Sequence, residues 1–207
     1  MEVLKKVLLL TAVIVIAAGV VFAQENARTA QAFSESYQLE AKWDYQGAIE
    51  TLKPVYEEGS YELNMRLGWL NYLTGKYTES EDYYKKAVVL KSYSIEAKFG
   101  YVYPLAALGN MKQVSEQYKD ILKIDKEQTT ANYRLGLICY YNSDFENAKK
   151  YFENVVNLYP MDHDSTLMLA WTYLNMKKSS EAKILFDKML ILFPDDKSAL
   201  EGLALIK

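Results

Sequence analysis

The chain of 207 residues has one cysteine, one histidine and four prolines. A single cysteine cannot form an internal disulfide, so packing alone must hold the folded chain together. The single histidine, His163, leaves no imidazole pair for a zinc site and no general base for most serine or cysteine nucleophiles. Its neighbours Asp162 and Asp164 cannot all face one ion with it, and Asp162 is better placed to cap a helix. We therefore predict no catalytic residue, no metal and no cofactor, and a protein that is not an enzyme.

Charge of one sign is also lacking. The chain carries 24 basic and 27 acidic side chains, for a net charge of −3. Removing residues 1–23 takes away Glu2, Lys5 and Lys6, which leaves 22 basic and 26 acidic groups and a net charge of −4. The lysines are spread evenly, and this balance argues against a surface that follows the phosphates of a nucleic acid.

Alternating apolar and polar runs, the mark of half-buried strands, are absent as well. Apolar residues instead recur at helical spacing, as in Leu67, Leu70 and Leu73. Gly75 and Gly109 fall where such a helix must end and turn, and glycine accepts the left-handed conformation needed there. With no strand there is no phosphate loop between a strand and a helix. The pattern predicts an all-α fold.

The chain repeats itself every 34 residues. Leu67-Gly68 and Leu135-Gly136 lie two periods apart, and Tyr101-Val102 and Leu169-Ala170 occupy the corresponding positions of the other copies. Pro160 and Pro194 close successive copies at the same spacing. A fixed period of this length indicates a stack of helix pairs, whose extended surface is suited to recognition.

The residues at corresponding positions of these copies resemble the tetratricopeptide repeat, and the resemblance covers about residues 29–207. In units 61–94, 95–128, 129–162 and 163–196, position 24 is always an aromatic ring: Tyr84, Tyr118, Phe152 and Phe186. A shorter unit over about 29–60 carries Tyr45 at position 17 and Ala48 at position 20. The resemblance implies a right-handed superhelical solenoid of about five helix pairs, with a capping helix in 197–207.

The N-terminus has the features of a secretory signal peptide. Two lysines precede an uncharged run from Val7 to Val21, and Val21-Phe22-Ala23 supplies short side chains before Gln24. We predict cleavage after Ala23, a short segment 24–28 before the repeats, and a periplasmic or secreted protein. The alternative is an uncleaved membrane anchor, since the apolar run reaches the lower limit for a membrane span.

In tetratricopeptide stacks the first helix of each pair lines the concave face, and the resemblance implies that its positions 2, 5, 9, 12 and 13 contact a partner. In this chain those positions are rich in aromatic side chains, which offer large contact areas with few rotatable bonds. Position 6 carries arginine twice, either to bind a carboxylate or phosphate or to form an internal ion pair. The predicted partner-binding residues are Phe33, Tyr37, Met65, Arg66, Trp69, Tyr72, Phe99, Tyr103, Tyr133, Arg134, Tyr140 and Trp171.

Two interpretations of this aromatic set stay open, since some rings could fill the core between repeats instead of facing a partner. The carboxylate clamp found in part of the family needs asparagine at position 9, where this chain has bulky residues, so that specificity is not implied. We predict an exported scaffold that binds a peptide or helix of a protein partner, in assembly of a cell-envelope complex. The alternatives are a carrier for a small apolar or lipid ligand and a membrane-anchored assembly factor. The sequence indicates no oligomeric state.

Overall fold

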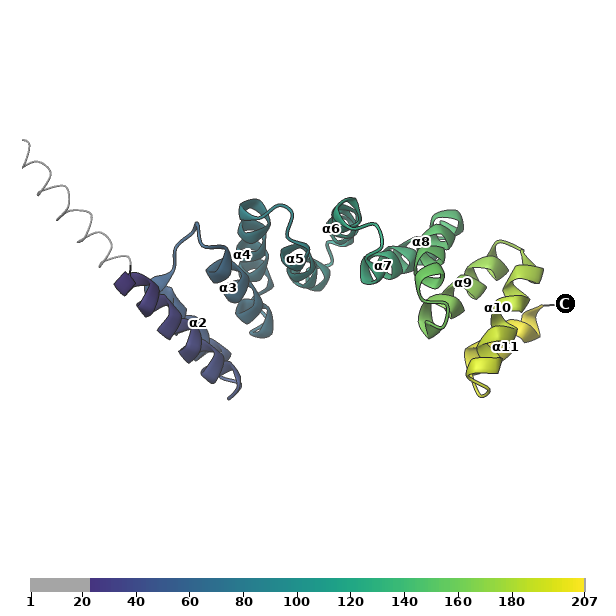
Figure 1. Ribbon diagram of the computed structural model, residues 1–207, viewed down its shortest axis with the longest axis horizontal. Coiled ribbons are helices and arrows are strands. Elements are labelled where there is room, and N and C mark those ends of the chain that lie inside the picture. The colour runs from purple at the N-terminus through teal and green to yellow at the C-terminus, as the bar shows by residue number, and fades with distance from the viewer. Residues whose placement is uncertain (1–22, 207) are drawn as a thin grey trace, which may run out of the picture. The chain divides into compact units, whose positions relative to one another are not determined.

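The computed structural model describes residues 23–206, and these are all-α, with no strand among them. They divide into two compact units, which we call unit 1 (to Ser92) and unit 2 (from Tyr93), and each is described by itself (Figure 1). The apolar run predicted to be a signal peptide lies outside the described residues.

Unit 1 begins with helical residues 23–40, followed by α2 (Tyr45–Leu52) and a 3-10 turn, η1 (Lys53–Val55). The pair α3 (Tyr61–Leu73) and α4 (Tyr77–Leu90) completes it. Residues 24–28, which the sequence set apart from the repeats, are part of the first helix. Their sequence, QENAR, consists mostly of good helix formers, so no boundary signal separates them from the rest of that helix.

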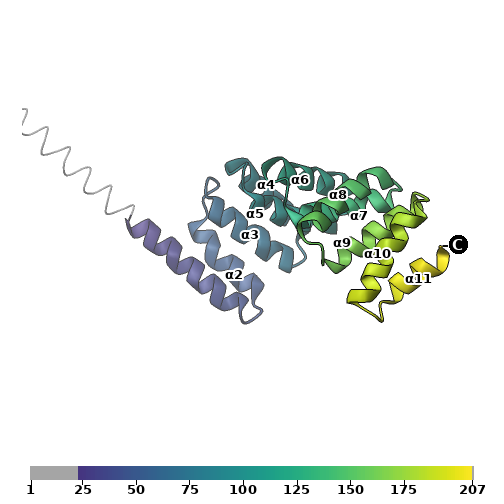
Figure 2. The ribbon, with the colours of Figure 1, turned by 45° about the vertical axis from the view of Figure 1, so that its right-hand side comes forward.

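Unit 2 contains three helix pairs and one terminal helix. The pairs are α5 (Ile95–Ala107) with α6 (Met111–Ile124), α7 (Thr129–Tyr141) with α8 (Phe145–Leu158), and α9 (His163–Asn175) with α10 (Ser179–Leu192). The terminal helix is α11 (Lys197–Leu205). Each helix packs on the next, and the first helices α7, α9 and α11 also contact one another along the unit (Figure 2).

The predicted period sets the helix boundaries. First helices begin at residues 61, 95, 129, 163 and 197, which are 34 residues apart, and the cap before each of them follows the same rule. Its side chain accepts a hydrogen bond from the backbone N–H three residues later, and the capping residues are Ser60, Ser94, Gln128, Asp162 and Asp196. The predicted cap at Asp162 is thus confirmed. Such caps pair a backbone donor that the first helical turn leaves unbonded.

The turn inside each helix pair contains one residue in the left-handed region. Gly75 and Gly109 both have φ of 76°, as predicted, and Ser143 and Lys177 hold the corresponding positions with φ of 61° and 60°. In the shorter first pair the residue is Trp43, with φ of 65°. A side chain in this conformation costs about 1–2 kcal/mol relative to glycine. The turn geometry is therefore imposed by the helices it joins even where glycine is missing.

Helix pairs are held together by an aromatic ring pressed on a small residue. In the pair α7–α8, a Cβ added to Gly136 would lie 2.6 Å from the ring of Phe152, which is fully buried. In the pair α3–α4, Gly68 faces Tyr84 in the same way, at 2.9 Å. The contact explains why the small residue and the ring recur together along the sequence.

The last helix, α11, is covered on one side only. Ala199 and Gly202 are buried, and Gly202 lies under the ring of Phe186. Ile206 packs against the same cluster, whereas Leu205 is 60% exposed. The reason is that Leu205 lies on the outer side of α11, where no further helix follows among the described residues.

We expect Gly136→Ala to lower the free energy of unfolding by about 1–3 kcal/mol, the usual cost of overpacking a core. Alanine is otherwise the better helix former by about 1 kcal/mol, so the sign of the change tests the contact with Phe152. Urea denaturation measures it. Gly59→Ala, in the turn before α3, is the control for an added methyl group without contacts, because no atom lies within 4 Å of a Cβ added there. A Gly136→Ala protein as stable as wild type would contradict the close approach.

Candidate functional site

The predicted partner-binding residues fall into two sets, one in each unit. Unit 1 holds six of them, on the helix 23–40 and on α3: Phe33, Tyr37, Met65, Arg66, Trp69 and Tyr72. Unit 2 holds the other six, on α5, α7 and α9: Phe99, Tyr103, Tyr133, Arg134, Tyr140 and Trp171. All twelve lie on first helices of the pairs, as the repeat pattern predicts.

In unit 1 the arginine forms an internal ion pair. Arg66 is 6% exposed, and its Nη1 donates to a carboxylate oxygen of Glu40 at the end of the preceding first helix. Its Nε donates to Ser36 Oγ at 3.1 Å, and its guanidinium carbon lies 4.0 Å from the centre of the Tyr37 ring. Of the two roles that the sequence left open for Arg66, the structure thus gives it the internal one. Arg66 thus connects the helix 23–40 to α3.

The same carboxylate orients a tryptophan. Trp69 Nε1 donates to Glu40 Oε1 at 2.7 Å, and the indole stacks on Tyr72 with ring centres 5.9 Å apart. Tyr72 in turn lies 5.7 Å from the ring of Tyr77, and on the neighbouring helix Phe33 and Tyr37 are 6.3 Å apart. Trp69 and Tyr72 are half-buried, whereas Tyr37 is exposed. Glu40 therefore orients Trp69 directly, and through Arg66 it is connected to Tyr37.

In unit 2, Tyr140 and Trp171 are linked across adjacent first helices. Asn175 Nδ2 donates to the Tyr140 hydroxyl at 3.0 Å and to the backbone oxygen of Trp171 at 2.9 Å. Trp171 Nε1 donates to Ser198 Oγ of α11 at 2.8 Å. Its ring meets Phe186 edge-on at 5.4 Å. A chain of polar contacts thus joins α7, α9 and α11 along one face.

Other predicted residues of unit 2 divide between the core and the surface. Phe99 packs edge-on against Tyr118, and Tyr133 lies 5.9 Å from Phe152, so both rings belong in part to the packing between helices. Tyr103 is 49% exposed and Arg134 is exposed as well. Both interpretations of the aromatic set therefore apply, each to different residues.

Burial moves the phenols of this region further from ionisation. It raises the pKa of Tyr118, of Tyr133 and of Tyr140. Burial, together with the hydrogen bond to Glu153, raises the pKa of Tyr173 to about 12. Each hydroxyl consequently stays protonated at neutral pH and can donate a hydrogen bond.

The three most exposed aromatic residues lie outside the predicted set, although Tyr141 occupies position 13 of its unit, one of the positions that the resemblance assigns to partner contact. Tyr141 is 76% exposed and meets Tyr140 edge-on, which extends the row of rings on α7. Trp43 is 79% exposed in the turn before α2, and Tyr93 is 84% exposed ahead of α5. The exposure of Trp43 could have been inferred from the sequence, because it lies in a turn and the corresponding turns carry glycine, serine or lysine. Tyr93 gave no signal of this kind.

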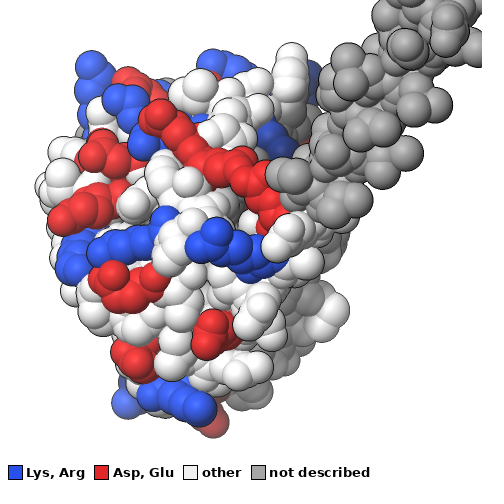
Figure 3. All heavy atoms as spheres, turned by 90° about the vertical axis from the view of Figure 1, so that its left-hand side faces the viewer, with Lys and Arg blue, Asp and Glu red and all other residues white. Residues whose placement is uncertain are grey.

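Electrostatics give the surface no dominant sign. On the face shown in Figure 3, acidic and basic side chains lie beside one another. Among residues 23–206, no group of three or more His, Cys, Asp or Glu side chains is arranged to hold a metal ion. Within the same part of the chain, no helix combines the length and the apolar character that a membrane span requires.

We expect Glu40→Ala to lower the free energy of unfolding by about 2–4 kcal/mol, because it leaves the buried Arg66 charge uncompensated. The Nη2 group of Arg66 is already buried without a hydrogen-bond partner in the described structure, so little can replace the lost carboxylate. Glu50→Ala is the control: its pair with Lys53 is exposed, and we expect a loss of at most about 1 kcal/mol. Equal urea midpoints for the two variants would contradict the role of the Arg66–Glu40 pair.

Comparison with known proteins gives one consistent family. Tetratricopeptide repeat models match residues 39–95, 129–161 and 164–196. Comparison with curated protein sequences gave no match.

Among solved structures, a tetratricopeptide repeat protein from Parabacteroides merdae is 21% identical, with a TM-score of 0.74 over 86% of this chain and 72% of that one. MamA is also 21% identical, with a TM-score of 0.71 over 88% of this chain and all of that one. YrrB, described as a tetratricopeptide protein with an unusual peptide-binding site, is 17% identical, with a TM-score of 0.71 over 88% and 95% of the two chains. The fold is typical of scaffolds without catalytic activity. The chain belongs to the tetratricopeptide repeat family of protein-interaction scaffolds.

Proposed function

We propose that this protein is an exported scaffold that holds a peptide segment of a protein partner against the aromatic face of its first helices, in assembly of a cell-envelope complex. The observation that supports this most is the linked set in unit 2. Tyr140, Trp171 and Asn175 form one hydrogen-bonded group, and Tyr141 extends it to the surface with 76% of its area exposed. A cell-envelope setting follows from the predicted signal peptide, not from the fold.

The chemistry of this face suits an extended or helical peptide with apolar anchors. Tyrosine and tryptophan bury much area on binding while losing few rotamers, and their polar atoms can pair with peptide groups. Here the rings are held in place before binding, because Asn175 fixes Tyr140 and Ser198 fixes Trp171. Pre-organised side chains lose less conformational entropy when a ligand binds.

The buried and the exposed residues of the predicted set have different roles in this proposal. Tyr133 packs against Phe152 and Phe99 packs against Tyr118, so these two rings stabilise the helices that carry the face. Arg134 is exposed on the same helix as Tyr140 and supplies a guanidinium for a carboxylate of the partner. That YrrB is described as having a peptide-binding site agrees with a peptide as the ligand class.

We expect a peptide selected from a random display library against the purified protein to lose at least about tenfold in affinity on Tyr141→Ala, as exposed aromatic anchors commonly do. Isothermal titration calorimetry measures the dissociation constants. Tyr141 is suited to this test because most of its side chain is exposed, so that its removal leaves the fold intact.

Ile184→Ala is the matched control. Ile184 is 66% exposed on α10, a second helix, and its truncation should leave peptide binding unchanged. Selected peptides that respond to Ile184→Ala and not to Tyr141→Ala would contradict the proposed surface. A lipid mass retained by the purified protein in native mass spectrometry would instead favour the carrier.

For export, we expect the first residue of the mature protein to be Gln24, as N-terminal sequencing of protein recovered from the periplasm or medium would show. The expectation rests on the charged, apolar and short-residue regions that precede it. Retention of the first 23 residues, with the protein sedimenting with membranes, would contradict cleavage and favour the membrane-anchored assembly factor.

A further inference from the structure

The single histidine lies where one helix cap meets the next. The capping residues of the first helices recur every 34 residues, and before α9 and the terminal helix α11 they are Asp162 and Asp196. His163 directly follows the first of these caps, and it is the first residue of α9. The corresponding residues of the three preceding first helices are Tyr61, Ile95 and Thr129, none of which carries a charge at neutral pH.

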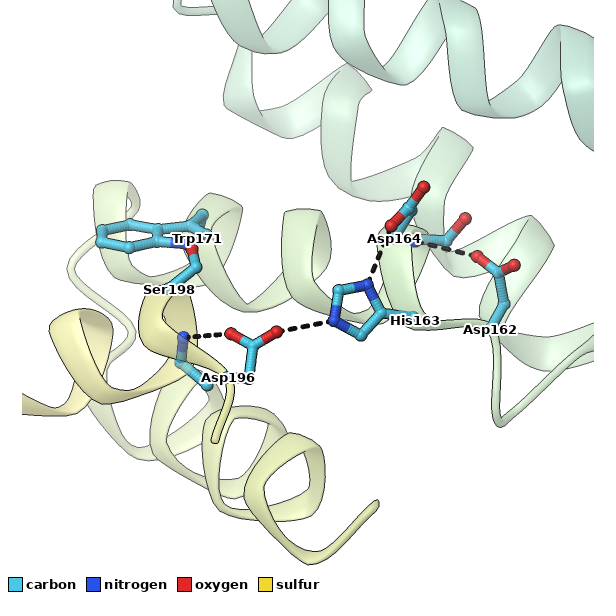
Figure 4. Close-up of polar contacts among 8 residues, drawn as sticks. Asp162, His163, Asp164, Trp171, Asp196 and Ser198 are labelled. Atoms are coloured by element: carbon cyan, nitrogen blue, oxygen red, sulfur yellow. Dashed lines mark hydrogen bonds and ion pairs between the residues drawn. The ribbon is translucent and has the colours of Figure 1, made fainter. Parts of the chain in front are cut away.

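The imidazole bridges two carboxylates from different helices (Figure 4). Its Nε2 lies 2.6 Å from Oδ2 of Asp196, and its Nδ1 lies 2.8 Å from Oδ1 of Asp164 in the first turn of α9. The other oxygen of Asp196 accepts the backbone N–H of Ala199 at 2.7 Å. One aspartate therefore both caps α11 and ties it to the start of α9.

Only a protonated imidazole satisfies both contacts. Protonated histidine has two N–H donors, whereas the neutral ring has one donor and one lone pair. After deprotonation, one of the two carboxylates faces that lone pair and its hydrogen bond is lost. The hydrogen bonds to Asp164 and to Asp196 accordingly raise the pKa of His163 above its usual value.

The two carboxylates in contact with His163 favour its charged form, and burial of the ring opposes it. Asp164 approaches from α9 itself and Asp196 from the start of α11, while the ring of Phe193, after α10, packs edge-on at 4.7 Å. Asp162 adds a third carboxylate next in sequence. On α7, burial raises the pKa of the Tyr133 phenol, and the charges of Asp164 and Asp162 raise it further, so this phenol is neutral. On α10 the ammonium of Lys188 is bonded to the backbone oxygen of Pro160.

α11 needs contacts with the rest of unit 2 to be stable. It has 9 residues, too few to be stable alone in water. Its inner side packs through Gly202 and Leu203 on the cluster around Phe186, while Leu200 on its outer side is 50% exposed. α11 also carries Ser198, which accepts the indole N–H of Trp171. The docking of α11 and the orientation of Trp171 are thus coupled.

The geometry points to a protonation-dependent clamp in which His163, bound to Asp164 and Asp196, docks α11 and thereby holds Trp171 in place. In the protonated state both carboxylates are paired and α11 is closed on α9. In the neutral state one of the two hydrogen bonds is lost and the other is no longer assisted by the imidazolium charge, so the contact with Asp196 is weaker or absent and α11 opens more often. The consequence for partner binding at Trp171 rests on the proposed function, whereas the clamp itself does not.

The pH range of the clamp depends on its two groups. Because the pKa of His163 is raised, its contribution to stability is complete below about 6.5, the unfolded value, and is lost as pH rises through the folded value. Burial raises the pKa of Asp196, but the hydrogen bonds from Ala199 and His163 outweigh burial and lower it overall. The contribution of Asp196 is therefore lost only as pH falls below about 3.8 through its folded value.

The test is hydrogen exchange of the α11 amides, expressed as protection relative to an unstructured peptide at the same pH. Between pH 5.5 and pH 8.5 we expect the protection of residues 201–205 to fall roughly three- to tenfold, the effect of one net hydrogen bond. Protection in α8 should stay constant. The Cε1 proton of His163, which gives the only histidine signal of the chain, should titrate with the same midpoint above pH 6.5.

Two variants separate the clamp from a general effect of pH. His163→Gln keeps one donor and does not titrate in this range, and Asp196→Asn keeps a capping side chain without the carboxylate. In both variants we expect α11 protection to be independent of pH. If His163 titrates while α11 protection stays constant in wild type, or falls equally in His163→Gln, the clamp is overturned.

A second measurement addresses the link to the binding face. The peptide obtained by display selection should bind more weakly at pH 8.5 than at pH 5.5 in wild type, and equally at both in His163→Gln. A pH-dependent α11 with pH-independent peptide binding in wild type would overturn the link to Trp171. Because the exchange experiment needs no peptide, its outcome is separate from that of the proposed function.

Discussion

The contact between an aromatic ring on one helix and a small residue on its partner is the constraint on which this structure depends. Gly136 lies so close to Phe152 that a single added carbon would collide with the ring, and Gly68 and Tyr84 show the same approach. This contact fixes the distance within the pairs α3–α4 and α7–α8. The first helices of the closed pairs carry aromatic residues on their exposed side, such as Tyr37, Tyr103 and Tyr141, while Phe99 and Tyr133 contribute to the packing between helices.

Polar contacts orient the aromatic side chains of the packed helices. In unit 1, Glu40 pairs with buried Arg66 and orients Trp69, so one carboxylate serves both the core and the candidate face. In unit 2, Asn175 and Ser198 do the same for Tyr140 and Trp171. In both units the side chains that hold these aromatic residues in place also join neighbouring helices. Stability and recognition are consequently linked, and a ligand meets rings that are already ordered.

Much of the fold could be predicted because a 34-residue period carries helix, turn and cap signals to every copy. The starts of α3, α5, α7 and α9 agree with the predicted units, and Gly75 and Gly109 adopt the expected left-handed backbone. The candidate site was less predictable. Position in the repeat places Tyr133 and Tyr140 on the same helix but does not show that Phe152 draws the first toward the core. Arg66 and Arg134 share one repeat position, yet only Arg66 has a glutamate within reach.

The sequence by itself determined the all-α fold, the helix pairs and the side of each first helix that carries the aromatic residues, because these depend on local periodicity and on turn and cap residues. Only the tertiary structure decided which of those residues support the core, and it alone paired His163 with Asp196, 33 residues away. Such pairings depend on the distance between side chains of different helices, which packing sets and a linear pattern does not contain. For this reason the contact of His163 with the start of α11 could not be read from the sequence, where His163 was notable only as the single histidine.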